Sequence, residues 1–140
     1  MKILITGAAG FVGKHLIEYL KKEGQYEILG IDLSFKNLGP DCSSDSIEVL
    51  EADLTNRESV YNIIKEFKPN QVYHLAAQSS VSYSWENPVE TFRINVFSGI
   101  NILEGLRLFC PGCRILVVCT AEEYGGINDG AEAIDESFKI

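Results

Sequence analysis

The chain has 140 residues, 46% hydrophobic and 23% charged, a composition typical of one soluble globular domain with a hydrophobic core. Asp and Glu total 20 against 12 Lys and Arg, and this net charge of −8, without any basic run, argues against nucleic-acid and anionic-membrane partners. The sequence contains no long apolar segment and no signal-peptide pattern, which predicts a cytoplasmic protein with no membrane partner.

Strand and helix patterns alternate from the amino terminus. The apolar run 2–6 predicts a strand, and residues 11–23 predict a helix behind a glycine turn. The run 26–32 predicts a second buried strand, and the polar stretch 34–46 predicts a loop. The apolar side chains expected on one side of the first helix are Phe11, Val12, Leu16, Ile17 and Leu20.

The alternation continues in the rest of the chain. Residues 47–53 predict a third strand, and the next helix is expected to be capped by Asn56 and ended by Pro69. Its apolar positions, at helical spacing, are Val60, Ile63, Ile64 and Phe67. A fourth strand (71–77), a long helix (88–109) opened by Pro88 and a fifth strand (114–120) follow, and the pattern fades from Gly125 onward.

This order of elements predicts the fold class. Strands that alternate with helices indicate an α/β protein with an open, mostly parallel, doubly wound sheet that carries helices on both faces. We expect a single domain over residues 1–140 with about five strands, an incomplete version of the Rossmann-type sheet.

A ladder of three glycines, Gly7, Gly10 and Gly13, lies between the first strand and the first helix. Glycine lets the backbone approach a pyrophosphate closely, and the helix amino terminus offers free N–H groups and a positive dipole. Asp32 ends the second strand, where a carboxylate can bind the adenosine ribose and repel a 2′-phosphate. The sequence therefore predicts NAD as cofactor, with NADP disfavoured. The alternative is a flavodoxin-like domain with a glycine turn and a chance surface Asp.

Cys110 and Cys113 have the C-x-x-C spacing found in redox and zinc sites. They follow a helix instead of opening one, and no second C-x-x-C or His pair supplies further zinc ligands. We interpret them as free thiols in a turn and predict no metal site.

Five motifs in order resemble the extended short-chain dehydrogenase/reductases, the NAD-dependent epimerase/dehydratase family. Within it, the likeness is strongest to the GDP-mannose 4,6-dehydratase and GDP-sugar reductase group. The motifs are TGAAGFVG (6–13), EADLTN around Asp53, HLAAQ (74–78), RINVFSG with Asn95, and CTAEEYG (119–125).

The resemblance implies a role for each matching residue. Gly7, Gly10, Phe11 and Val12 of the glycine ladder would hold the pyrophosphate through backbone N–H groups. Asp32 would bind the adenosine ribose, and Asp53 with Leu54 would flank the adenine. The residues expected to line the cofactor cleft are Leu75, Ala76 and Ala77. Asn95 is expected to be buried in a helix that faces the sheet, where it would fix the backbone near the site.

The same resemblance implies two catalytic residues after the fifth strand. Thr120 would hydrogen-bond the sugar oxygen that is oxidised, and Glu122 would act as acid/base in loss of water. The alternative for Glu122 is a solvated acidic turn. The sequence departs from the family pattern at two positions: Cys119 stands where a Ser is usual, and Glu123 stands where the dehydratases more often have an apolar residue. The reaction therefore stays undecided among dehydratase, 4-epimerase and 4-keto-6-deoxy-sugar reductase.

The family's Tyr-x-x-x-Lys pair is absent: Tyr124 is followed at the required spacing by Asn128, and Tyr83 by Asn87. We therefore expect the cofactor-binding half of a longer nucleotide-sugar enzyme, acting on a GDP-sugar and inactive by itself. The alternative is a non-enzymatic NAD-binding module. A reading frame that continues to such a pair supports the first interpretation, and a stop codon after residue 140 supports the second.

The long helix 88–109 also predicts self-association. Phe92, Val96, Gly99 and Leu103 are expected to face the sheet, while Ile94, Phe97 and Leu108 lie on other faces. A helix that is apolar on more than one side usually buries both. In the resembling enzymes this helix packs in a dimer interface, which implies a homodimer.

Overall fold

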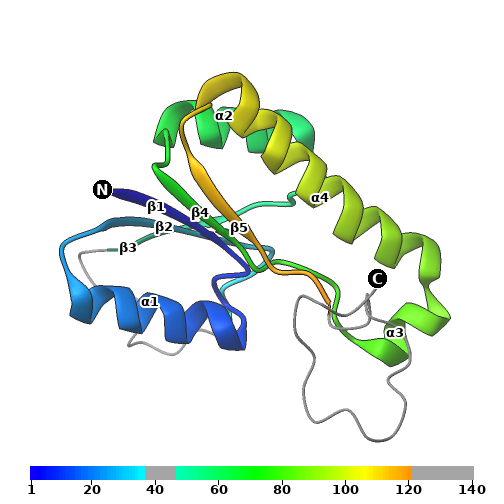
Figure 1. Cartoon of the computed structure of the whole chain (residues 1–140). Helices are drawn as coiled ribbons and strands as arrows, with labels where there is room; N and C mark the ends of the chain where they lie inside the picture. The colour runs from blue at the N-terminus through cyan, green and yellow to red at the C-terminus, as the bar shows by residue number, and fades with distance from the viewer. Residues whose placement is uncertain (37–46, 121–140) are drawn as a thin grey trace, which may run out of the picture.

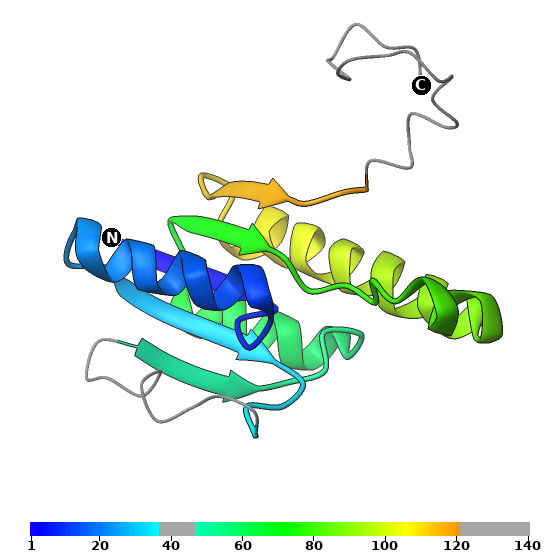
Figure 2. The same cartoon turned by 90° about the horizontal axis from the view of Figure 1, so that it is seen from below.

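The computed structural model describes residues 1–36 and 47–120, which form one parallel sheet in the order β3-β2-β1-β4-β5. Figure 2 shows the strands side by side, and Figure 1 shows helices above and below the sheet. The strands are β1 (Lys2–Thr6), β2 (Glu27–Asp32), β3 (Ile47–Glu51), β4 (Gln71–His74) and β5 (Arg114–Val117). The helices are α1 (Phe11–Glu23), α2 (Arg57–Phe67), α3 (Val81–Glu86) and α4 (Pro88–Phe109). The predicted α/β fold class is confirmed.

The central strand β1 separates two hydrophobic clusters. On one face, Ile3 and Ile5 pack with Ile17 and Leu20 of α1. On the other face, Leu4 joins a larger cluster with α2 and α4. Figure 1 shows this arrangement, with α1 below the sheet and α2 and α4 above it. Both faces of β1 are therefore buried, as expected for a continuous apolar strand in a parallel sheet.

The limits of α2 follow from local chemistry that the sequence predicts. The Asn56 side chain accepts a hydrogen bond from the backbone N–H of Ser59, which satisfies one free donor of the first turn. At the other end Lys68 is left-handed, with φ of 51°, and Pro69 follows it. Strands β3, β4 and β5 end two or three residues earlier than predicted.

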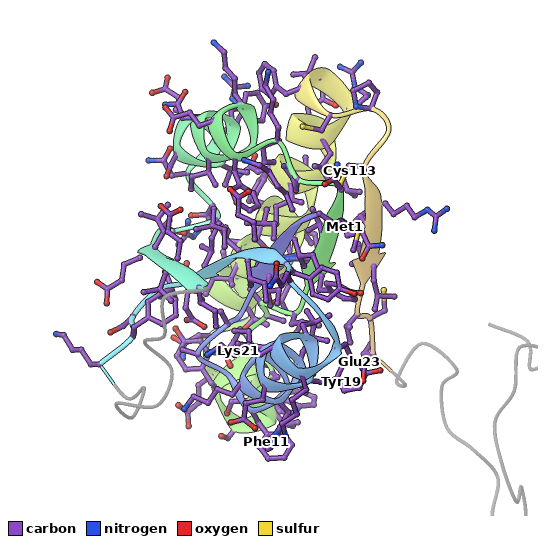
Figure 3. All side chains as sticks on the ribbon, turned by 90° about the vertical axis from the view of Figure 1, so that its left-hand side faces the viewer. Met1, Phe11, Tyr19, Lys21, Glu23 and Cys113 are labelled. Atoms are coloured by element: carbon purple, nitrogen blue, oxygen red, sulfur yellow. The ribbon has the colours of Figure 1, made fainter. Side chains whose placement is uncertain are left out.

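The bounds of α1 match the predicted helix 11–23, but the prediction that Phe11 and Val12 share a side with Ile17 and Leu20 was wrong. Phe11 is 80% exposed and Val12 is also exposed, so neither joins the core with Ile17 and Leu20. Figure 3 shows Phe11 projecting from the end of α1 away from the sheet. Both residues line a cavity at the start of α1 instead of packing in the core.

The prediction of which side of α4 faces the sheet was also wrong. Phe92 and Leu103 are exposed, and Val96 and Gly99 are only half-buried. The buried side consists of Ser98, Asn101, Ile102, Gly105 and Leu106. At Gly105 this side lies close to α2, because a Cβ there would come 2.7 Å from Cδ1 of Ile64. The short helix α3 was not predicted, and the Ser80 side chain caps it by accepting from the N–H of Tyr83.

Cys110 and Cys113 lie in the turn between α4 and β5, as predicted, and both are free thiols. Figure 3 places Cys113 there. The N–H of Cys113 donates to the carbonyl of Cys110, closing the turn. Burial raises the pKa of Cys113 to about 11, with a contribution from the Cys110 thiol, and this disfavours the reactive thiolate. Among residues 1–36 and 47–120 no cluster of metal-binding side chains is found, and no helix is long and apolar enough to cross a membrane.

Candidate cofactor-binding site

The glycine ladder forms a tight turn at the carboxyl end of β1. Gly7 has φ of +70°, a conformation that favours glycine, and its carbonyl accepts a hydrogen bond from the N–H of Gly10. A Cβ on Gly7 would lie 2.9 Å from the backbone N of Ala76. A Cβ on Gly13 would lie 2.2 Å from the carbonyl oxygen of Gly7. There is no room for a side chain at Gly7 or Gly13. Backbone atoms alone therefore occupy these positions of the turn at the amino terminus of α1.

Asp32 holds this turn against the end of β2. Its Oδ2 accepts a hydrogen bond from the N–H of Ala9 at 2.9 Å, and its Oδ1 accepts from the N–H of Leu33 at 2.8 Å. The N–H of Ala8 also donates to the carbonyl of Ile31. The carboxylate thus lies beside the glycine turn, where the sequence places it.

A cavity of about 660 Å³ opens at this edge of the sheet, where the carboxyl ends of the parallel strands meet. It lies among the glycine turn, the ends of β2, β3 and β4, and the first half of α4. Eleven of the residues that the sequence predicts for cofactor binding line it: Gly7, Gly10, Phe11, Val12, Gly13, Asp32, Asp53, Leu54, Leu75, Ala76 and Ala77. The predicted residues therefore converge on one site from four separate segments.

Asn95 is the exception. It is exposed, not buried as predicted, and it does not line the cavity. Its Oδ1 accepts from the backbone N–H of Gln78 at 2.7 Å, and its Nδ2 donates to the Gln78 carbonyl at 3.2 Å. Asn95 thus holds the backbone of the segment after β4 without lining the cavity itself. Gln78, to which it is hydrogen-bonded, does line the cavity. The side chain fixes nearby backbone geometry as predicted, but without burial.

Of the two predicted catalytic residues, Thr120 and Glu122, the structure describes only Thr120. Thr120 lies just beyond β5, is exposed, and does not line the cavity. Glu122 lies outside the described residues, as do Glu123 and Tyr124.

A polar cluster that the sequence analysis missed lies on the α4 side of the cavity. Arg93 donates from Nε and Nη2 to both carboxylate oxygens of Glu90, at 2.8 and 2.7 Å. Its Nη1 donates to Oγ1 of Thr55 at 2.7 Å. The hydrogen bond from Arg93 lowers the pKa of the Glu90 carboxyl. The i,i+3 spacing of Glu90 and Arg93 signals their pairing, but no local pattern signals the contact with Thr55.

Beneath the cavity, two buried polar side chains join β1 to β4. Oγ1 of Thr6 lies 2.7 Å from Nδ1 of His74, and it accepts from the N–H of Ala76 at 3.3 Å. Because that hydroxyl has one proton, the arrangement suits a donation from Thr6 to a neutral imidazole. Burial lowers the pKa of His74 and so favours the neutral form. This network holds the end of β4 beside the glycine turn.

We expect the free energy of unfolding to decrease as the pH falls below about 6.5. The folded His74 has a pKa below its ordinary value of 6.5, so the unfolded chain binds more protons in this range and gains stability relative to the folded chain. Urea unfolding at pH 7.5, 6.5 and 5.5 measures the effect. His74→Asn should flatten the pH dependence, whereas His15→Asn, at the exposed second histidine, should leave it intact. An unchanged slope in His74→Asn contradicts the prediction.

The geometry fits a dinucleotide. The turn supplies backbone N–H groups and a helix amino terminus for a pyrophosphate. Among the described residues that line the cavity, Asp32, Asp53 and Glu90 are acidic and Arg93 alone is basic. Arg93 is paired with Glu90, so the cavity presents carboxylates to a ribose and offers no unpaired cation to a further phosphate.

Comparison with known proteins agrees with this geometry. Residues 4–140 match the family model described as GDP-mannose 4,6 dehydratase. The chain is 34% identical over 132 residues to CDP-paratose 2-epimerase of Salmonella typhi, and 33% identical over 140 residues to GDP-mannose 4,6-dehydratase of Vibrio cholerae. These matches cover 91% of this chain in both cases, but 39% and 37% of the relatives.

A solved structure gives the same result. UDP-glucose 4-epimerase of Thermus thermophilus, in complex with NAD, superposes with a TM-score of 0.84 at 32% identity, covering 99% of this chain and 43% of that one. The chain thus spans about two fifths of the length of these relatives. The glycine turn, the acidic end of β2 and the match over nearly the whole sequence agree: this chain belongs to the GDP-mannose 4,6-dehydratase family, within the NAD-dependent epimerases and dehydratases of the extended short-chain dehydrogenase/reductases.

Proposed function

We propose that the chain binds NAD in the cavity at the carboxyl edge of the sheet. The observation that carries the proposal is the glycine turn, in which Gly7 and Gly13 leave no room for a Cβ while Asp32 lies hydrogen-bonded beside it. The pyrophosphate would lie on the N–H groups at the start of α1, near Gly10 and Phe11. Asp32 would accept hydrogen bonds from the adenosine ribose.

Within the family, we propose the cofactor-binding part of a nucleotide-sugar dehydratase of the GDP-mannose 4,6 type, a lyase of the cytoplasm. The family model and the Vibrio cholerae relative support this assignment. When bound, NAD supplies a hydride acceptor and later returns the hydride. Thr120 would orient the sugar hydroxyl, and Glu122 would move the proton at the adjacent carbon. Both roles rest on motif likeness.

A 4-epimerase is the second candidate. It is favoured by the Thermus thermophilus UDP-glucose 4-epimerase, whose structure superposes on nearly the whole chain. Both candidates begin by oxidising the sugar at one carbon and need the same cofactor site. They differ in the later steps of the reaction, because only the dehydratase requires the acid/base that we assign to Glu122.

The experiment tests whether the chain binds NAD without turning over a nucleotide-sugar substrate. Calorimetric titration of the 140-residue chain should show NAD binding, whereas incubation with NAD and GDP-mannose should give no 4-keto sugar. The chain contains no Tyr-x-x-x-Lys pair, and loss of such an acid/base alone costs roughly 10²- to 10⁴-fold in rate. Absence of NAD binding would overturn the proposed cofactor site. Sustained product formation would show that the catalytic residues are misassigned.

We also propose that α4 mediates a homodimer. The apolar side chains exposed along this helix are Val89, Phe92, Phe97, Ile100, Leu103 and Leu108. Such a stripe is more apolar than a solvated helix surface requires. Sedimentation velocity should show a dimer at micromolar concentration, and Phe92→Glu together with Leu103→Glu should convert it to monomer. A monomer at all concentrations contradicts the proposal.

A further inference from the structure

The turn that joins α4 to β5 has the sequence CPGC (110–113) and carries two thiols. The N–H of Cys113 donates to the carbonyl of Cys110 at 2.9 Å, so the four residues form a closed β-turn. In such a turn the first and fourth Cα atoms lie within about 7 Å, and a disulfide joins Cα atoms roughly 4.4–6.8 Å apart. The backbone therefore places Cys110 and Cys113 at a spacing that suits a disulfide.

The two side chains also lie on the same side of the turn. Both are half-buried, and both pack against the larger hydrophobic cluster, which contains residues of α2 and α4. Sγ of Cys110 lies 3.8 Å from the carbonyl oxygen of Ile64, and Sγ of Cys113 lies 3.4 Å from that of Arg114. A thiol is a weak donor, and the Ile64 carbonyl also accepts from the N–H of Lys68 at 2.9 Å. Loss of the thiol protons therefore costs the folded chain little.

The turn is accessible and lies away from the cofactor cavity. Pro111 and Gly112 are exposed, and nothing lies within 4 Å of a Cβ added to Gly112. Arg114, which follows the turn, pairs with the first residue of β4, so the turn lies at the amino edge of the sheet. The cavity opens at the carboxyl edge and is lined by neither cysteine. A small reagent can therefore reach the two thiols without entering the cofactor site.

We propose that Cys110 and Cys113 form a redox modification site, at which a small-molecule disulfide such as oxidised glutathione converts the two thiols into an intramolecular disulfide. The thiolate of one cysteine attacks a sulfur of oxidised glutathione and releases one glutathione thiolate, which leaves a mixed disulfide on the chain. The thiolate of the other cysteine attacks the protein sulfur of that mixed disulfide and releases the second glutathione. The chain loses two electrons and two protons, and the two glutathione thiols take them up.

Cys110 is the expected first nucleophile. Burial raises the pKa of both thiols, but the positive charge of Lys68 opposes this effect at Cys110. At Cys113 the neighbouring Cys110 thiol raises the pKa further, to about 11. Because the thiolate is the attacking species, the reaction should be slow at pH 7 and about tenfold faster at pH 8.

The experiment uses the full chain with Cys42→Ser and Cys119→Ser, so that Cys110 and Cys113 supply its only thiols. After incubation with oxidised glutathione at pH 8 and an acid quench, the intact mass should show the loss of two hydrogen atoms and no bound glutathione. Dithiothreitol should reverse this change. Adding Cys113→Ser should instead trap one glutathione on Cys110, because the thiol that resolves the mixed disulfide is gone.

Thermal unfolding then shows whether the disulfide fits the native turn. A cross-link restricts the unfolded chain, so the oxidised two-thiol variant should melt several degrees above its reduced form. The same treatment of a variant with all four cysteines changed to Ser should leave its melting temperature unchanged. A stable mixed disulfide in the two-thiol variant, no reaction, or a disulfide that lowers the melting temperature would each overturn the inference. None of these readouts depends on NAD binding, so the proposed function and this inference fail separately.

Discussion

Replacing Gly13 with alanine should weaken NAD binding strongly and destabilise the fold. The new Cβ would lie 2.2 Å from the carbonyl oxygen of Gly7 and 2.8 Å from Cα of Ala8, both backbone atoms. Neither can move without displacing the turn whose N–H groups we propose to hold the pyrophosphate. We expect NAD affinity to fall by about 100-fold or more, because those groups no longer converge. The free energy of unfolding should fall by about 2 kcal/mol, as in other overpacked sites.

Gly112→Ala provides the control. Gly112 lies in the turn before β5, and nothing lies within 4 Å of an added Cβ. This variant should bind NAD and unfold in urea like the parent chain. The two measurements together separate crowding at the glycine turn from the general cost of changing a glycine. NAD binding by Gly13→Ala at parental affinity would show that the turn is not the pyrophosphate site.

Asp32 should make the chain prefer NAD to NADP, on the order of 100-fold. The 2′-phosphate of NADP would meet the carboxylate within a few ångströms, and like charges at that separation repel by several kcal/mol at the effective dielectric of a protein surface. Asp32→Asn should bring the two affinities to within about tenfold of each other. Affinity for NAD should itself decrease, since the charged acceptor for the N–H of Ala9 is lost.

Glu27→Gln is the matched control for charge. Glu27 lies at the opposite end of the same strand, where it pairs with Lys2 at 2.9 Å. The substitution changes the net charge by the same amount as Asp32→Asn, but Glu27 lies far from the glycine turn along β2. The ratio of NAD to NADP affinity should therefore stay at the parental value. Calorimetric titration with both cofactors measures all three proteins. Equal binding of NAD and NADP by the parent chain would contradict the role given to Asp32.

The sequence predicts the elements of this fold well because their signals are local. The strand runs, the apolar spacing of α2 and the cap at Asn56 depend on neighbours within a few residues, and the structure confirms them. The site at the carboxyl edge is also predictable in outline. Parallel strands bring their carboxyl ends to one edge, so the glycine turn, Asp32 and the residues after β4 must meet there.

The errors on α1 and α4 have a common physical cause. Hydrophobicity predicts that a large apolar residue is buried, but Phe11 and Phe92 are exposed while Ser98 and Gly105 are buried. Burial depends on what lies opposite, and at Gly105 the approach of Ile64 from α2 leaves little room for a side chain. Asn95 was predicted to be buried, but it is exposed and hydrogen-bonds the backbone of Gln78. Its role depends on the path of the backbone after β4 rather than on the helix that carries it.

By itself, the sequence determined the order and type of every described element except α3, the parallel sheet and the family, because each of these is expressed in short contiguous motifs. Only the tertiary structure decided which polar groups meet. Thr6 and His74 are 68 residues apart, and Thr55 and Arg93 are 38 apart, yet each pair is 2.7 Å apart in the folded chain. Hydrogen bonds require sub-ångström placement of two directional groups, and that placement comes from the packing of whole strands and helices rather than from any local pattern.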